Sequence, residues 1–171
     1  MKRHDTLRTL SWATTAASVG HSLDPDEHAR VAAVLSNPGR VDAQTIEHIK
    51  AVLWRCERQD DTLGPQGVLD TVLAQRNLAR ALVPECPADL RQRLLSVLSD
   101  ASRQAGWLSF DLHDFTSAEY YYEDARTLAH EAENIELGAI VLCGMSHLAT
   151  WQRKPRTGIA HAVAAGVCCK A

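Results

Sequence analysis

Two side chains able to bind a metal, Cys143 and His147, lie four residues apart on one face of a predicted helix. A thiolate and an imidazole at this spacing can supply two metal ligands. A structural zinc site needs four protein ligands and a catalytic zinc site about three. The other histidines are scattered along the chain without metal-like clustering. We therefore favour a packed thiol beside a histidine over a metal site, and we expect no metal and no cofactor.

The remaining candidates for catalysis are few. Glu119 and Glu123 share a helix face, but a solvated surface explains them better than an acid–base pair. His113 and Asp114 fall where one helix should end and the next begin, so Asp114 is expected to cap a helix. The segment Gly144–Ser146 lacks the preceding strand and the second glycine of a nucleophile elbow. With no phosphate-binding or metalloprotease motif either, we predict that the protein is not an enzyme.

Composition describes an ordinary globular chain. It has 171 residues, 46% of them hydrophobic and only 5% aromatic, with a formal net charge of −3. A protein that binds nucleic acid through its phosphates is usually basic, so the bulk charge does not favour that class. The five cysteines are odd in number and form no CxxC pair, which favours free thiols in a reducing cytoplasm.

The N-terminus gives an alternative to this localisation. Lys2, Arg3 and Arg8 precede a weakly apolar run over residues 10–19, which imitates a signal peptide and loosely resembles a twin-arginine export signal. Ser and Thr residues interrupt the run, so an amphipathic first helix is the preferred interpretation. No run approaches the ~20 apolar residues that a membrane span requires.

Hydrophobic periodicity predicts helices throughout, and capping residues and prolines mark their ends. Asp24 and Asp42 are expected to cap two of them, and Pro84 and Pro87 to interrupt the chain before a long helix. The predicted helices cover residues 6–19, 24–36, 42–63, 65–83, 89–113, 116–133, 134–152 and 156–171. The helix after Asn134 is apolar over much of its circumference and is expected to lie deep. We find no convincing strand pattern.

Small residues predict how the helices meet. Gly106 stands opposite Ala118, and Tyr122 and Ala125 continue the inward face of the second helix. This order of small and aromatic residues is typical of a tetratricopeptide (TPR) hairpin. A second unit would pair Ser146 with Gly158, followed by Ala162 and Ala165, at an offset of about 40 residues where the TPR standard is ~34.

The fold class is therefore predicted to be all-α, with antiparallel helical hairpins stacked as a short TPR-like α-solenoid. We expect residues 1–87 to form an N-terminal helical region that packs on TPR-like repeats in residues 88–171. The last helix is alanine-rich and no polar capping helix follows it, so the array is expected to be incomplete at its C-terminus.

In a TPR-like hairpin the first helix lines the concave face, and two groups of residues are candidates for contacts with a ligand or partner. The first is Asp100, Arg103, Trp107, Phe110 and Asp111, and the second is Ile140, Cys143, His147, Thr150 and Trp151. Aromatic and charged residues together suit a peptide-binding surface. The alternative is that Trp107, Phe110 and Trp151 serve interhelix packing, which large aromatics often do.

Three segments carry a resemblance to a known family: LDPDEHARVAAVLSNPGRVDAQTIEHI, RQDDTLGP and AGWLSFDLHDFTSAEYYYEDARTLAHEAEN. In this order they resemble the C-terminal region of transcriptional regulators of high-GC Gram-positive bacteria. In that family an XRE-type helix-turn-helix domain is followed by a TPR-like domain. The resemblance extends from about Asp5 to Ala165. Met1 stands where the DNA-binding domain of the family has ended, so we expect no direct nucleic-acid binding by this chain.

The resemblance implies a cytoplasmic sensory or protein-interaction domain. Such a domain would bind a peptide, a partner protein or a small signal molecule, and would transmit the effect by helix shifts. It is expected to be non-catalytic and not to bind membranes, with a homodimer as one arrangement. The alternatives are a truncated regulator that only self-associates, a small metal-binding helical protein that uses Cys143 and His147, and an exported protein.

Overall fold

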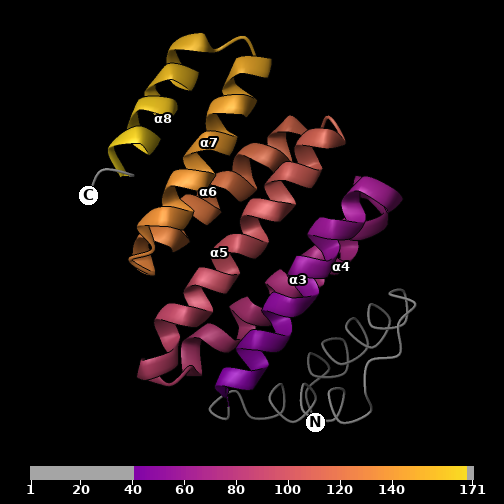
Figure 1. Cartoon of the computed structure of the whole chain (residues 1–171), viewed down its shortest axis with the longest axis vertical. Helices are drawn as coiled ribbons and strands as arrows, with labels where there is room; N and C mark the ends of the chain where they lie inside the picture. The colour runs from indigo at the N-terminus through magenta and orange to yellow at the C-terminus, as the bar shows by residue number, and fades with distance from the viewer. Residues whose placement is uncertain (1–40, 169–171) are drawn as a thin grey trace, which may run out of the picture.

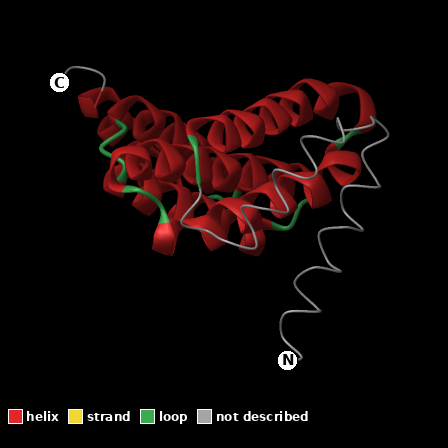
Figure 2. Ribbon diagram, turned by 90° about the horizontal axis from the view of Figure 1, so that it is seen from below, coloured by secondary structure: helices red, strands yellow, loops and turns green. Residues whose placement is uncertain are grey.

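The protein is described by a computed structural model over residues 41–168, and every regular element there is helical (Figures 1 and 2). The elements are α3 (Ala43–Leu63), α4 (Pro65–Leu82), the 3₁₀ turn η2 (Val83–Glu85), α5 (Ala88–Asp111), α6 (Phe115–Glu131), α7 (Ile135–Trp151) and α8 (Pro155–Cys168). The all-α prediction is confirmed. The helices predicted over residues 6–19 and 24–36, and Cys169, lie outside the described residues.

Successive helices pack as antiparallel neighbours, consistent with stacked hairpins. The first helices of the three hairpins, α3, α5 and α7, lie side by side in Figure 1, with α5 in contact with both α3 and α7. These three helices form what we call the inner row. Residues on their shared side therefore come from all three hairpins.

The predicted helix boundaries at the start of the described chain are confirmed. Asp42 caps α3, and its Oδ1 accepts hydrogen bonds from the backbone N–H and the hydroxyl of Thr45, each at 2.7 Å. Gly64 ends α3 at φ 71°, a conformation that favours glycine, and Pro65 opens α4. Pro84 and Pro87 flank the break before α5, since proline cannot supply the N–H that a continuing helix needs.

The three later turns repeat one backbone design. His113, Glu133 and Arg153 all have positive φ, at 63°, 52° and 59°, and each is 20 positions from the next. After α5, the Asp114 N–H donates to the Ser109 carbonyl (2.9 Å) and the His113 N–H to the Phe110 carbonyl (2.9 Å). This pair of bonds is a Schellman motif. The motif recurs after α6 (Asn134 to Ala129 at 2.9 Å, Glu133 to His130 at 3.0 Å) and after α7 (Lys154 to Ala149 at 2.9 Å, Arg153 to Thr150 at 3.1 Å).

Asp114 and Asn134 perform two tasks in these turns. Each ends one helix through its backbone N–H and caps the next through its side chain. The Asp114 carboxylate accepts from the Ser117 N–H (3.1 Å), and the Asn134 side chain accepts from the Leu137 N–H (3.0 Å). The predicted capping role of Asp114 is confirmed, and the double use explains why the turns are so short.

The main hydrophobic core lies among α3, α4 and α5 and reaches the end of α6. Its fully enclosed members are aliphatic side chains at helical spacing: Ile46, Ile49, Leu53, Val72, Leu82, Leu94 and Leu98. This cluster crosses the predicted boundary between residues 87 and 88, and the division into two parts stays a prediction. A smaller cluster around Ala118, Tyr122, Ala125, Val141 and Leu148 joins α6 to α7.

Tyr122 of α6 fills the space left by two glycines. A Cβ on Gly106 would lie 3.0 Å from its ring, and a Cβ on Gly144 would lie 2.7 Å from it. The predicted inward face of Ala118, Tyr122 and Ala125 is confirmed, since all three are buried. The role of Gly144 was not predicted. Tyr122 therefore contacts α5 and α7 at once, through the two positions where no side chain is in the way.

The second predicted hairpin pair is present with one difference. Ser146 donates to the Gly158 carbonyl at 2.8 Å, and Gly158 and Ala165 are buried as expected. Ala162, which stands where Tyr122 stands in the first hairpin, is exposed. The expectation that α7 lies deep was wrong, because Ile135 and Ile140 are about half exposed. Apolar residues all round a helix bury fully only where neighbours cover every side.

A buried polar network connects α4, α5 and α6. The Arg76 guanidinium, 6% exposed, donates to Ser102 (2.9 Å) and to Asp124 (2.8 Å), and Ser102 donates to the same Asp124 oxygen (2.7 Å). Arg80 reaches both oxygens of Asp124 at 2.6 and 2.7 Å. These bonds hold the pKa of Asp124 below its ordinary value despite the opposing effect of burial. A buried charge is tolerated here because every partner is hydrogen-bonded.

Within residues 41–168, no helix is both long enough and apolar enough to cross a membrane. The longest helix, α5, has 24 residues, but it carries charged residues at intervals along its length. The most apolar helix, α7, has 17 residues, which is at the lower limit for a span.

We expect Arg153→Gly to stabilise the protein. Positive φ costs a residue with a Cβ about 1 kcal/mol that glycine does not pay. The Arg153 side chain makes no hydrogen bond or ion pair within the described chain that the change would remove. Thermal unfolding should show a Tm higher by about 2–4 °C. The control Arg153→Ala keeps the Cβ and should show no such gain; an equal gain in both variants would contradict the explanation.

Two glycines of α7 provide a matched pair for the Tyr122 contact. Gly144→Ala should destabilise by about 1–3 kcal/mol, because its methyl group would overlap the Tyr122 ring. Gly138→Ala should stabilise by about 0.5–1 kcal/mol, because a Cβ there meets only the Ala129 methyl at 3.9 Å and alanine favours the helix. Urea denaturation measures both. Similar changes in stability at the two sites would show that the packing of Tyr122 does not depend on the missing side chain at Gly144.

Candidate functional site

Four aromatic rings of the inner row form a continuous cluster. Trp107 and Phe110 lie on α5, and His147 and Trp151 lie on α7. The ring centroids are 5.8 Å apart for Trp107–Phe110, 5.8 Å for Trp107–His147, 4.9 Å for Phe110–His147 and 5.9 Å for Phe110–Trp151. The structure thus brings together aromatic candidates that are up to 44 positions apart in the sequence. We call these four residues the aromatic cluster.

The aromatic cluster is held in place but not covered. The Trp151 indole N–H donates to His147 Nε2 at 2.9 Å, which fixes the two rings relative to each other. Trp107 is 38% exposed and Trp151 is 62% exposed. Packing alone therefore does not account for these rings, since a tryptophan that served only the core would be mostly buried.

Of the contact residues predicted on α7, His147 and Trp151 belong to the aromatic cluster, and the others lie outside it. Cys143 is exposed and lines a shallow depression between α7 and α8 together with His147. Thr150 is also exposed and donates to the Ser146 carbonyl at 2.9 Å, and Ile140 is about half exposed. Among residues 41–168, no group of three or more His, Cys, Asp and Glu side chains is placed to hold a metal ion.

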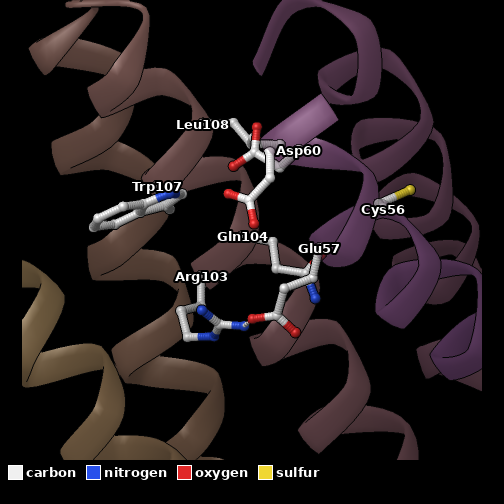
Figure 3. Close-up of a pocket in the computed structure, with 8 residues that line it drawn as sticks. Cys56, Glu57, Asp60, Arg103, Gln104, Trp107 and Leu108 are labelled. Carbon is white, nitrogen blue, oxygen red and sulfur yellow. Dashed lines mark hydrogen bonds and ion pairs between the residues drawn. The ribbon is translucent and has the colours of Figure 1, made fainter. Parts of the chain in front are cut away.

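A small cavity adjoins the aromatic cluster between α3 and α5 (Figure 3). It has a volume of about 230 Å³ and is lined by Cys56, Glu57, Asp60, Asp61, Arg103, Gln104, Trp107 and Leu108. Figure 3 shows Trp107 on the α5 side, opposite Asp60 of α3. Trp107 belongs to both the cavity and the aromatic cluster, so the two form one continuous surface on the inner row.

Arg103 is committed to ion pairs at one end of the cavity. Its Nε donates to Asp100 at 2.8 Å, and its NH2 group donates to Glu57 at 3.2 Å, which joins α5 to α3. These two carboxylates keep the pKa of Arg103 above its ordinary value, although burial opposes them. Gln104 also donates to Asp100, at 3.0 Å. The donors in this part of the cavity are thus already engaged.

Asp60 has no lysine or arginine partner in the described chain, and its carboxylate interacts with the Trp107 indole through a side-chain hydrogen bond. Its Oδ1 is buried and has no hydrogen-bond partner within the described chain. Burial raises the pKa of Asp60, and the negative charges of Asp111 and Asp61 raise it further, while the Trp107 indole opposes the rise. Burial also raises the pKa of Asp111, against the effect of His147 and His113. A raised carboxylate pKa beside a cavity is a feature of functional sites.

Cys56 of α3 also lines this cavity, and in Figure 3 its sulfur points away from the other lining side chains. Cys56 is almost fully buried, and burial raises its pKa to about 11. The side chain is therefore a neutral thiol at physiological pH and a poor nucleophile. It acts here as a small apolar residue of the core.

The sequence did not identify the contribution of α3 to this surface. The run from Glu57 to Thr62 lies at the end of the helix predicted over residues 42–63, where no contact residue was predicted. The overlooked signal was the buried stripe of Leu53 and Cys56, because helical spacing carries that stripe on to Asp60. Likewise, the position of Arg76 between Val72 and Ala79 indicated that its guanidinium is buried.

The two glutamates considered as an acid–base pair, Glu119 and Glu123, form exposed ion pairs with other residues. Glu119 pairs with Lys154 at 2.9 Å, and Glu123 pairs with Arg126 at 2.8 Å, all four side chains being about half exposed. Of the three consecutive tyrosines, only Tyr122 is buried. The carboxylates at 119 and 123 therefore serve separate surface ion pairs, each worth little to stability.

We expect Asp60→Asn to raise the stability of the protein at neutral pH by up to about 1 kcal/mol, because it removes a partly buried negative charge that is repelled by Asp61 and Asp111. The folded-state pKa of Asp60 lies above the ordinary value of 3.8, so the folded state binds this proton more tightly than the unfolded state. The penalty is therefore fully present above the folded-state pKa and disappears as the pH falls to the ordinary value.

Thermal unfolding of the wild type and Asp60→Asn, measured from neutral pH down to about the ordinary carboxylate pKa, checks the direction of this change in stability. The Tm gain of the variant should be largest at neutral pH and should shrink on acidification. Asp70→Asn, at an exposed carboxylate of α4, is the control and should change the Tm little at any pH. A loss of stability in Asp60→Asn at neutral pH would show that the carboxylate is satisfied by groups not considered above.

Comparison with family models, with curated proteins and with solved structures gives no match to this chain. The structure supports an all-helical domain of six stacked helices over the described residues, and no family is identified. The resemblance to XRE-type regulators stays a prediction from the sequence. Function must therefore be inferred from the chemistry of the site and not from a relative.

Proposed function

We propose that this protein is a non-catalytic interaction domain that binds a peptide segment of a partner protein along its inner row. The observation that carries the proposal is the aromatic cluster, in which exposed rings from two hairpins lie next to one another. Tyrosine, tryptophan and arginine supply most of the binding energy at protein interfaces. Here two tryptophans and Arg103 lie on one surface.

The shape of the surface supports an extended ligand. The cavity between α3 and α5 and the rings between α5 and α7 follow one another across the row, with Trp107 between them. A peptide crossing the three helices would contact both. Its apolar side chains would cover the exposed rings, and its polar groups would meet the charged residues of the cavity.

The same features argue for a prearranged site. Trp107, Phe110 and His147 contact one another, and the Trp151 indole is bonded to His147, so the rings lose little freedom when a ligand binds. The sequence resemblance implies that such a domain takes part in transcriptional regulation. In that setting peptide binding would bias the packing of α5 against α7, and this bias is how we propose that the signal leaves the domain.

A phage-displayed library of random peptides tests the proposal. Selected peptides are synthesised, and their Kd values are measured against the wild type and three single variants. Trp107→Ala and Trp151→Ala should each weaken binding by about tenfold or more, because they truncate central rings. Trp54→Ala is the control: Trp54 is also exposed, on α3, but lies outside the aromatic cluster and the cavity lining, and its removal should leave Kd unchanged.

Circular dichroism of each variant accompanies the titrations, so that lost binding is not mistaken for lost structure. Failure to select any peptide would reject the proposed function. Selection of peptides whose affinity depends on Trp54 and not on Trp107 or Trp151 would place the interaction on a different face and would also reject it.

A further inference from the structure

The cavity between α3 and α5 has an excess of negative charge. Arg103 is neutralised by its ion pairs with Asp100 and Glu57. Two further carboxylates of the lining, Asp60 and Asp61, and Asp111 beside the cavity have no lysine or arginine at ion-pair distance in the part of the chain that the structure describes. The negative charges of Asp111 and Asp61 both raise the pKa of Asp60. In a partly buried site such charges interact strongly, so a positively charged group would be attracted to it.

The remaining features of the cavity indicate which chemical class of cation it would bind. The Trp107 ring borders it, and an indole face attracts organic cations, arginine above all. No three ligands in the described residues are grouped for a metal ion. A volume of about 230 Å³ is below the usual range for a whole small-molecule ligand, about 300–1,000 Å³, but it suits one side chain.

We propose that this cavity receives an arginine side chain of the bound peptide, with the guanidinium against the Asp60 and Asp61 carboxylates and beside the Trp107 indole. The inference rests on the proposed function, because the peptide backbone would lie on the neighbouring aromatic cluster. It adds the chemistry of the ligand: a basic residue followed by apolar residues that cover Phe110, His147 and Trp151.

Arginine fits this position better than lysine. Its planar fork presents several N–H donors at once, so it can serve Asp60 and Asp61 together. The buried Oδ1 of Asp60 has no donor within the described chain, and a guanidinium entering the cavity would supply one after a small rotation of the carboxylate. Arg103 is held by Asp100 and Glu57, and no hydrogen bond joins it to this oxygen of Asp60.

The test uses the full chain with ¹⁵N-labelled tryptophan, and follows the indole N–H signals by NMR. The probe is the capped tripeptide acetyl-Ala-Arg-Ala-amide, and its neutral match has citrulline in place of arginine. The Trp107 signal, assigned through Trp107→Phe, should move with the arginine peptide and not with the citrulline peptide. The Trp54 signal should stay in place. Asp60→Asn should weaken binding of the arginine peptide by about tenfold or more.

Asp60→Asn is expected to be at least as stable as the wild type, so weakened binding could not be attributed to unfolding. Asp70→Asn should bind like the wild type. Equal responses to the arginine and citrulline peptides would overturn the inference, as would an unchanged affinity in Asp60→Asn. Tighter binding of agmatine, a free small cation with the same guanidinium, would also overturn it, because the natural occupant would then be a small molecule and not a peptide side chain.

The outcome is distinguishable from failure of the proposed function. If random peptides are selected and depend on Trp151, but lack arginine and bind Asp60→Asn as tightly as the wild type, the function stands and the inference fails. If no peptide is selected, the function fails, and the inference fails with it.

Discussion

The packing of Tyr122 against two glycines determines how the middle of the stack is spaced. The ring projects from α6 between α5 and α7, and it can do so only because Gly106 and Gly144 leave room on both sides. The distance between α5 and α7 in turn decides whether Trp107 and Phe110 can meet His147 and Trp151. The exposed aromatic cluster thus depends on a neighbouring buried contact between the same helices, and Phe110 joins the two because it packs against the buried cluster that contains Tyr122. A side chain with no role at the surface sets the geometry of the surface.

The network around Asp124 fixes the position of the preceding hairpin. Arg76 and Arg80 come from α4, Ser102 from α5 and Asp124 from α6, so one carboxylate joins three helices. An apolar interface at this place would permit sliding, whereas directional bonds between charged groups fix the rotation of each helix. The rotation of α5 matters most, because that helix carries Ser102 into the network on one side and Arg103 and Trp107 into the candidate site on the other.

Local sequence rules predicted the helices well and the site only in part. Caps, prolines and apolar spacing act within one helix, so Asp42, Gly64 and Asn134 could be recognised from the sequence alone. The aromatic positions on α5 and α7 followed from the hairpin pattern. The contribution of α3 did not, because the meeting of Asp60 with Trp107 depends on how two hairpins are stacked, and no local pattern encodes that. The exposure of Ile140 could not be predicted for the same reason: it depends on what covers α7.

The three equal turns give the chain a modular character. Their hydrogen bonds join backbone groups, and the residues at the left-handed position are as different as histidine, glutamate and arginine. The turn therefore places few demands on side chains, while the interval of 20 residues between turns is kept. A gene segment encoding two such intervals would carry a complete hairpin whose ends have the same geometry. Duplication or loss of that segment would lengthen or shorten the stack by one unit without disturbing the register of the others, a route by which such proteins could change the length of their binding surface.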